Sequence, residues 1–235
     1  MVKVWDLPTR LFHWILVLLF AVLWLSGTVG GIDLPLPGGK TIMNTDLHML
    51  LGQVVLAMVL YRVLWGLLGS STARFSSFVR GPAAVIAYLK AVRSGQHPLF
   101  AGHNPAGALM ILAVLSLLLL QAGTGLFSND DILSEGPLAA TVGKDLSDTL
   151  TGFHGLIADG LIALVIVHVC AVVVYRLKGE NLVKPMVTGY KDRASLPPGE
   201  PAPRMVSPLL ALVLLAVSVG AVFWGVPLLA AHFGG

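Results

Sequence analysis

Residues 154–175 read HGLIADGLIALVIVHVCAVVVY, an apolar run with a histidine at its first position and a second histidine, His168, fourteen positions later. A run of about 20 apolar residues is long enough to cross the hydrocarbon core of a bilayer as a helix. On such a helix His154 and His168 are separated by about 21 Å of rise and by only about 40° of rotation. The two imidazoles therefore point in the same direction at two different depths of the membrane.

Other apolar runs of similar length occur at residues 11–30, 47–68, 105–127 and 205–230. All are predicted to be helices, because lipid offers no water to satisfy open backbone groups. The composition agrees, since 56% of the 235 residues are hydrophobic and 11% are charged, against about 25% charged residues in soluble domains. An ordinary soluble enzyme is therefore excluded, and we expect an all-α, multi-pass membrane protein.

Basic residues are unevenly distributed among the loops. All but two of the 15 Lys and Arg residues lie in the N-terminal segment or in the loops after the second and fourth runs, with their flanks. The first and third loops hold only Lys40 and Lys144, together with most of the acidic residues. Cytoplasmic loops carry the excess of Lys and Arg, which places the N-terminus in the cytoplasm and the C-terminus in the periplasm. The basic charge thus reflects topology and lipid attraction, and nucleic-acid binding is not expected.

Four of the seven histidines lie in or at the ends of the predicted spans. They are His13, His48, His154 and His168. Ionisable groups in such positions are costly and are functional by default. With the orientation above, His13 and His168 lie toward the inner face of the membrane, and His48 and His154 lie toward the outer face.

Two facing pairs of histidines are what two haems require, because each iron takes one imidazole from each side. The chain has no Cys-x-x-Cys-His motif and a single cysteine, Cys170, so the haems would be non-covalent and b-type. With both axial positions filled by protein, the expected task is electron transfer. Two other interpretations stay open: hydrogen bonding of single histidines across helices, and a metal site, although zinc prefers about four ligands at one point.

Several residues near these histidines are candidate supports for such a cofactor. Gly27, fourteen positions after His13, and Gly52, four after His48, leave room for a flat group against the backbone. Arg10, one turn before His13, is either a partner for a haem propionate or a charge that sets topology. His103 is a candidate to bind a quinone or a propionate, or to make a hydrogen bond at the start of a helix.

The chain divides by composition into a bundle and an additional span. We expect residues 1–191 to form a four-helix transmembrane haem bundle. Within them, residues 82–93 begin with proline and repeat apolar residues every three or four positions, which predicts a short helix on the inner membrane surface. Residues 192–204 are a Pro-rich linker. Residues 205–235 form an additional C-terminal fifth transmembrane helix.

The opening of the chain, Val4-Trp5-Asp6-Leu7-Pro8-Thr9-Arg10-Leu11-Phe12-His13-Trp14, resembles the first motif of the bacterial cytochrome b561 group, which includes the b-type cytochrome subunits of nickel–iron hydrogenases. Similar motifs follow at residues 47–52, 102–110, 124–127, 153–154, 168–171 and 181–186. The resemblance covers roughly residues 1–191, and the fifth helix departs from it. It implies a di-haem cytochrome in which His13 and His168 hold the inner haem and His48 and His154 hold the outer haem.

The resulting expectation is a cytochrome of the bacterial inner membrane with two haem b groups. It would carry electrons between the quinone pool and a redox partner such as a c-type cytochrome or an oxidoreductase subunit. A quinone is therefore a further candidate ligand. The acidic third loop, residues 129–148, either attracts a basic partner or reflects the scarcity of Lys and Arg in outer loops.

Two alternatives to this expectation stay open. The protein could be a stand-alone quinone-linked oxidoreductase that oxidises a small external reductant such as superoxide. A function of a different class would be a haem-free metal-binding or structural membrane subunit. The sequence does not decide whether the protein is itself an enzyme, an electron-transfer protein or a subunit of a quinone-linked oxidoreductase.

Overall fold

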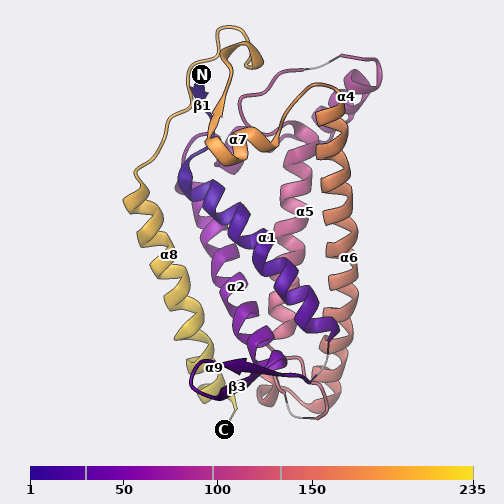
Figure 1. The fold of residues 1–235 in the computed structure, drawn as a ribbon, viewed down its shortest axis with the longest axis vertical. Coiled ribbons are helices and arrows are strands. Elements are labelled where there is room, and N and C mark those ends of the chain that lie inside the picture. Colours follow the sequence, from indigo (N-terminus) through magenta and orange to yellow (C-terminus); the bar gives the residue numbers. More distant parts are fainter. Residues whose placement is uncertain (30, 97, 133, 235) are drawn as a thin grey trace. The chain divides into compact units, whose positions relative to one another are not determined.

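The computed structural model describes residues 1–29, 31–96, 98–132 and 134–234 (Figure 1). Within them, five helical segments are long and apolar enough to cross a membrane. They are α1 (Leu7–Thr28), α2 (Asn44–Leu68), α5 (Pro105–Gly125), α6 (Lys144–Leu177) and the segment Pro208–Phe233. The protein is thus an all-helical, multi-pass membrane protein.

The surfaces of these helices are apolar. Leu18 of α1 is 68% exposed and Leu156 of α6 is 66% exposed, and many other large hydrophobic side chains also point outward. Contiguous apolar surface of this extent is unfavourable in water. It is the surface that a lipid environment requires.

Helix α1 begins at Leu7, four residues before the expected start at residue 11. The reason lies in Asp6, whose Oδ1 accepts a hydrogen bond of 2.7 Å from the backbone N–H of Thr9. This is the hydrogen bond of an N-terminal helix cap. The other carboxylate oxygen, Oδ2, accepts a hydrogen bond of 3.2 Å from the Trp65 indole Nε1. Asp6 thereby fixes the start of α1 and ties it to the end of α2.

Helix α6 begins at Lys144, so the expected start at residue 154 was wrong by almost three turns. These first turns are polar, and hydropathy alone does not detect them. Their hydroxyl groups bond to backbone carbonyls: Ser147 Oγ donates to the carbonyl of Phe127 at 2.6 Å, and Thr151 Oγ1 donates to that of Ser147 at 2.9 Å. Figure 1 shows α6 as one unbroken helix, and it carries both His154 and His168.

The fifth apolar segment contains a break that the sequence prediction of one helix over residues 205–230 did not include. Helix α8 (Pro208–Phe223) ends and α9 (Gly225–Phe233) begins on either side of Trp224. Pro227 lies in the first turn of α9 and has no backbone N–H to donate to the carbonyl of Phe223. The missing hydrogen bond accounts for the interruption.

Short elements fill the connections. Strands β1 (Val2–Lys3) and β4 (Tyr190–Lys191) pair antiparallel, with Val2 opposite Lys191, and β2 (Asp33–Leu36) and β3 (Lys40–Met43) form a hairpin. Helix α4 (Pro82–Arg93) occupies the range expected of the surface helix. The remaining elements are α3 (Phe75–Phe78), α7 (Val183–Thr188), η1 (Ala139–Thr141) and η2 (Arg193–Ser195).

The chain forms two compact units, each assembled from three segments. The first unit comprises Met1–His13, Arg62–Leu115 and Ala163–Leu214, and the second comprises Trp14–Tyr61, Ser116–Ile162 and Leu215–Gly235.

Each unit has buried apolar residues of its own. In the first unit these include Val4, Trp5, Ala101 and Leu196. In the second unit, Val222 and Val226 pack with Ala57 of α2 and Leu138. The end of the fifth apolar segment is therefore part of the core of the second unit.

Candidate functional site

The first unit brings together two of the four membrane histidines. His13 on α1 and His168 on α6 face one another with ring centres 6.4 Å apart and an angle of 59° between the ring planes. His13 is half-buried, whereas His168 is exposed. His13 lies in the first turns of α1, and His168 lies in the second half of α6.

The second unit brings together the other two. His48 on α2 and His154 on α6 have ring centres 6.1 Å apart, and their planes are inclined by 74°. Both rings are half-buried. The two pairs thus have nearly the same separation, although α6 is joined by α1 in the first pair and by α2 in the second.

Each ring of the second pair lies against a glycine. A Cβ atom added to Gly27 of α1 would lie 3.1 Å from Cε1 of His48, and one added to Gly125 of α5 would lie 3.0 Å from Cε1 of His154. Real Cβ contacts are rarely so short. Gly27 was expected to leave room at this level of the membrane. Gly125 was not singled out from the sequence.

Hydrogen bonds hold the same two rings. Ser26 Oγ lies 3.0 Å from Nδ1 of His48, and the backbone carbonyl oxygen of Gln121 lies 2.9 Å from Nδ1 of His154. Sequence reasoning missed both residues. The signal for Ser26 was a hydroxyl residue followed by glycine inside an apolar run, a pattern that recurs at Thr124-Gly125, whereas Gln121 acts through its backbone carbonyl and gave no such signal.

The four histidines remain two separate pairs. Within the residues that the structure describes, no group of three or more His, Cys, Asp or Glu side chains is arranged to hold a metal ion. A pair of imidazoles is enough for a metal only when another molecule supplies the remaining ligands, as a porphyrin does.

The sequence model of the prokaryotic cytochrome b561 family matches residues 4–189, which include all four histidines. The chain belongs to this family. No curated protein and no solved structure matches it. The protein is therefore a membrane b-type cytochrome that takes part in electron transfer, and proteins of the family bind b-type haem.

His103 of the cytochrome lies in an apolar and cationic part of the first unit. Its ring centre is 4.6 Å from that of Trp5 and 4.7 Å from that of Phe78. Burial, with smaller contributions from the charges of Arg62 and Lys191, lowers the pKa of His103 to about 3. The imidazole is therefore neutral at physiological pH.

The helix-start role considered for His103 belongs to its neighbour. Asn104 Oδ1 accepts a hydrogen bond of 2.7 Å from the backbone N–H of Gly107 and so caps α5. Nδ1 of His103 is buried and makes no hydrogen bond to any described residue. The role of His103 toward a quinone or propionate stays a prediction.

Two cationic side chains of the first unit lie close to the strand pair β1–β4. Arg10 donates a hydrogen bond to the backbone carbonyl of Val187, and its guanidinium lies against Gly189. Lys191 donates to the carbonyl of Phe100 at 3.3 Å, and burial lowers the pKa of its ammonium group. Arg10 thus connects the start of α1 to the backbone at Val187 and remains a candidate for a propionate, and Lys191 holds the backbone at Phe100.

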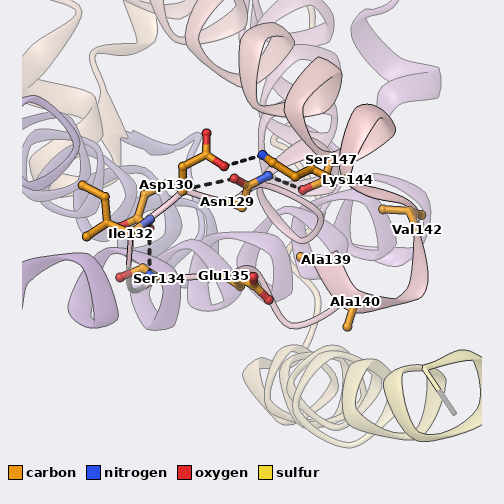
Figure 2. Close-up of a pocket in the computed structure, with 11 residues that line it drawn as sticks. Asn129, Asp130, Ile132, Ser134, Glu135, Ala139, Ala140, Val142, Lys144 and Ser147 are labelled. Atoms are coloured by element: carbon orange, nitrogen blue, oxygen red, sulfur yellow. Dashed lines mark hydrogen bonds and ion pairs between the residues drawn. The ribbon is translucent and has the colours of Figure 1, made fainter.

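The acidic loop between α5 and α6 surrounds a cavity of about 530 Å³ (Figure 2). None of the four paired histidines lines it. At its rim Lys144 forms ion pairs with Asp131 and with Asp148, the latter at 2.9 Å. The one basic residue of this loop thus lies between two of its acids.

Proposed function

We propose that this cytochrome holds two haem b groups and carries electrons across the bacterial inner membrane between the quinone pool and a redox partner. His13 and His168 hold the inner haem, and His48 and His154 hold the outer haem. The observation that carries the proposal is the pair of facing imidazoles in each unit, with ring centres 6.4 and 6.1 Å apart.

The separations suit two axial ligands of one iron. An imidazole nitrogen lies roughly 2 Å from a bound metal, and the ring centre lies roughly 1 Å behind that nitrogen. Two imidazoles on opposite sides of one metal therefore have centres roughly 6 Å apart. Rotation of either ring about its bond to the metal leaves this separation unchanged, so the angles of 59° and 74° are also compatible.

The chemistry of the donors fits haem as well. A porphyrin supplies four nitrogen ligands itself and needs only the two axial ones from the protein. The haem, when bound, accepts and releases one electron at a time. The two imidazoles of each pair would hold it from both sides and would leave no open position for oxygen, which favours electron transfer over oxygen chemistry.

The charge distribution of the loops indicates which histidine pair lies toward which side of the membrane. Basic residues in the N-terminal segment and in the second and fourth loops favour a cytoplasmic N-terminus. The pair His13 and His168 then serves the cytoplasmic side, and the pair His48 and His154 serves the periplasmic side. Residues 1–191 form the haem-binding domain, and the fifth apolar segment is added to it through the Pro-rich residues 192–204.

The decisive experiment counts haem per chain in the purified protein and records the reduced-minus-oxidised absorption spectrum. The expected result is two low-spin b-type haems. His168→Ala should remove the inner haem and leave most of the outer one, because the two pairs share no ligand. His232→Ala is the matched control, since His232 is exposed near the C-terminus and should leave both haems in place.

Other outcomes would overturn parts of the proposal. A protein without haem, after expression with ample haem supply, would leave the four histidines to be tested for metals. Retention of both haems by His168→Ala would contradict the pairing. Direct reduction of quinone by the purified protein with a small reductant, without a protein partner, would favour a self-contained oxidoreductase.

A further inference from the structure

The ring of His48 is held through Nδ1 by a serine hydroxyl. Ser26 Oγ lies 3.0 Å from His48 Nδ1, and the same oxygen donates its proton to the backbone carbonyl of Leu23 at 3.1 Å. A carbonyl oxygen can only accept a hydrogen bond. With its proton directed to Leu23, Ser26 Oγ accepts the N–H of His48 Nδ1, and the Leu23 carbonyl is also a backbone hydrogen-bond partner of the His48 ring.

The ring of His154 adopts the same protonation state through a different partner. Its Nδ1 lies 2.9 Å from the carbonyl oxygen of Gln121, so Nδ1 carries the proton. Its Nε2 lies 3.0 Å from the side-chain nitrogen of Gln121, an amide N–H that can only donate. Nε2 of His154 therefore offers a lone pair, which an iron would take in place of the amide.

The two rings are supported by equivalent pairs of residues on different helices. Ser26-Gly27 on α1 supports His48, and Thr124-Gly125 on α5 supports His154. In each pair the glycine meets the edge of the ring that contains Cε1 and Nδ1. This contact and the hydrogen bond to Nδ1 together limit the rotation of each ring, while Nε2 of His154 also bonds to the Gln121 side chain on the same helix.

The two supports differ in what they are made of. His154 is held mainly by a backbone carbonyl, because the Gln121 carbonyl oxygen lies 2.9 Å from Nδ1 whereas Thr124 Oγ1 lies 3.3 Å from it. His48 is held by the Leu23 carbonyl and by the Ser26 side chain, and one substitution can remove the Ser26 hydroxyl. Groups that accept the N–H of a metal-bound imidazole fix its orientation and raise its basicity.

We propose that Ser26 is a positioning residue that holds His48 as an axial ligand and lowers the reduction potential of the outer haem. The inference rests on the proposed function, since it concerns the haem between His48 and His154. A more basic imidazole stabilises ferric iron, so loss of the Ser26 hydroxyl should favour the ferrous form.

The test is a redox titration of the purified holoprotein with haem quantified per chain, for the wild type, Ser26→Ala and Ser26→Thr. In Ser26→Ala one haem should gain up to about tenfold in its ferrous-to-ferric ratio at a given potential, which is about 59 mV for a one-electron couple. The ferric electron paramagnetic resonance signal of that haem should also change. Ser26→Thr keeps the hydroxyl and should restore both properties.

Thr28 provides the matched control on the same helix. Its hydroxyl donates to the carbonyls of Trp24 and Leu25, both at 3.0 Å. These partners belong to the same helix, so the hydrogen bonds are local to α1. Thr28→Ala removes a hydroxyl two positions from Ser26 and should leave both potentials unchanged.

The outcomes separate this inference from the proposed function. Absence of haem from the wild type would contradict the proposed function. Two haems in Ser26→Ala with wild-type potentials would contradict the role of Ser26 alone. Loss of the outer haem in Ser26→Ala with rescue by Ser26→Thr would support it, whereas the same loss in both variants would assign Ser26 to packing.

Discussion

The close approach of Gly125 to His154 gives a prediction at the scale of a single residue. A methyl group at position 125 would lie 3.0 Å from His154 Cε1 and 3.3 Å from its Nδ1. The ring must therefore shift, and its hydrogen bond to the Gln121 carbonyl lengthens. Gly125→Ala should lower the occupancy of one of the two proposed haems severalfold, as measured by haem per chain and by the reduced-minus-oxidised spectrum.

Gly123, two positions earlier on α5, is the control for this substitution. No described atom lies within 4 Å of a Cβ built at position 123, apart from the helix's own nearby backbone. Since alanine is favoured over glycine in a helix by about 1 kcal/mol, Gly123→Ala should keep both haems and leave stability equal or slightly higher. Equal haem loss in the two variants would show that α5 tolerates no side chain on either face.

His103 gives a residue-scale prediction about pH. Burial holds the pKa of His103 near 3, below the ordinary value of 6.5. The unfolded chain therefore binds a proton at His103 below pH 6.5 that the folded protein rejects. The resulting loss of stability begins near pH 6.5 and grows toward pH 3, at up to about 1.4 kcal/mol per pH unit.

Thermal unfolding in detergent at pH 7.5 and pH 5 measures this effect. The wild type should lose stability between the two values, and His103→Gln should lose less, because glutamine does not titrate. The comparison between variants removes the contribution of other groups. An identical loss in both proteins would show that His103 is solvated or protonated in the folded state.

Asp6 gives a prediction at the scale of an element, because it sets the start of α1 and accepts the indole N–H of Trp65. Asp6→Ala removes a helix cap, worth about 0.5–2 kcal/mol. It also removes one of two acceptors of the Trp65 indole N–H, at about 0.5–1.5 kcal/mol, because Thr9 Oγ1 at 3.3 Å still accepts that hydrogen. We expect a fall in unfolding free energy within the range of these two effects, measured by thermal or chemical unfolding in detergent.

Asp192 is the matched control for Asp6. It also precedes a helical turn, η2, but its side chain makes no capping hydrogen bond and it is exposed. Asp192→Ala should change stability by less than about 0.5 kcal/mol. If both substitutions cost the same, the cap at Asp6 is not what fixes α1.

At the scale of elements, sequence periodicity and length predicted more about the middle of each helix than about its ends. The apolar runs identified the five segments that can span a membrane. The first turns of α6 were missed because Ser147 and Thr151 satisfy their hydroxyls on nearby backbone carbonyls, which hydropathy does not register. The break at Trp224 follows from Pro227, whose presence in an apolar run was visible in the sequence but was not used.

At the scale of the whole molecule, the topology predicts where each end of the chain lies. A reporter enzyme that folds only outside the cytoplasm should be active when fused after residue 232, beyond the fifth apolar segment. The same reporter fused after residue 191, beyond the fourth, should be inactive. The two activities are measured in whole cells at equal expression, and the opposite pattern would invert the orientation inferred from the basic loops.

The membrane histidines were predictable at this scale because ionisable side chains are rare in apolar helices. Their depths along the helices grouped them as His13 with His168 and His48 with His154, and these are the rings that face one another in the two units. The partners of their second ring nitrogens were not predictable. A serine or a backbone carbonyl in an apolar helix has many local functions, and only the packed structure shows which of them reaches Nδ1.

Because α6 is unbroken between His154 and His168, insertions and deletions between these two residues are expected to be harmful. One inserted or deleted residue between the two histidines would rotate one ring by about 100° relative to the other. One of the two proposed sites would then lose a ligand. Replacement of one aliphatic side chain by another in this stretch leaves the angle unchanged. Homologous chains that keep both histidines are therefore expected to vary here in side-chain identity and to conserve the number of residues.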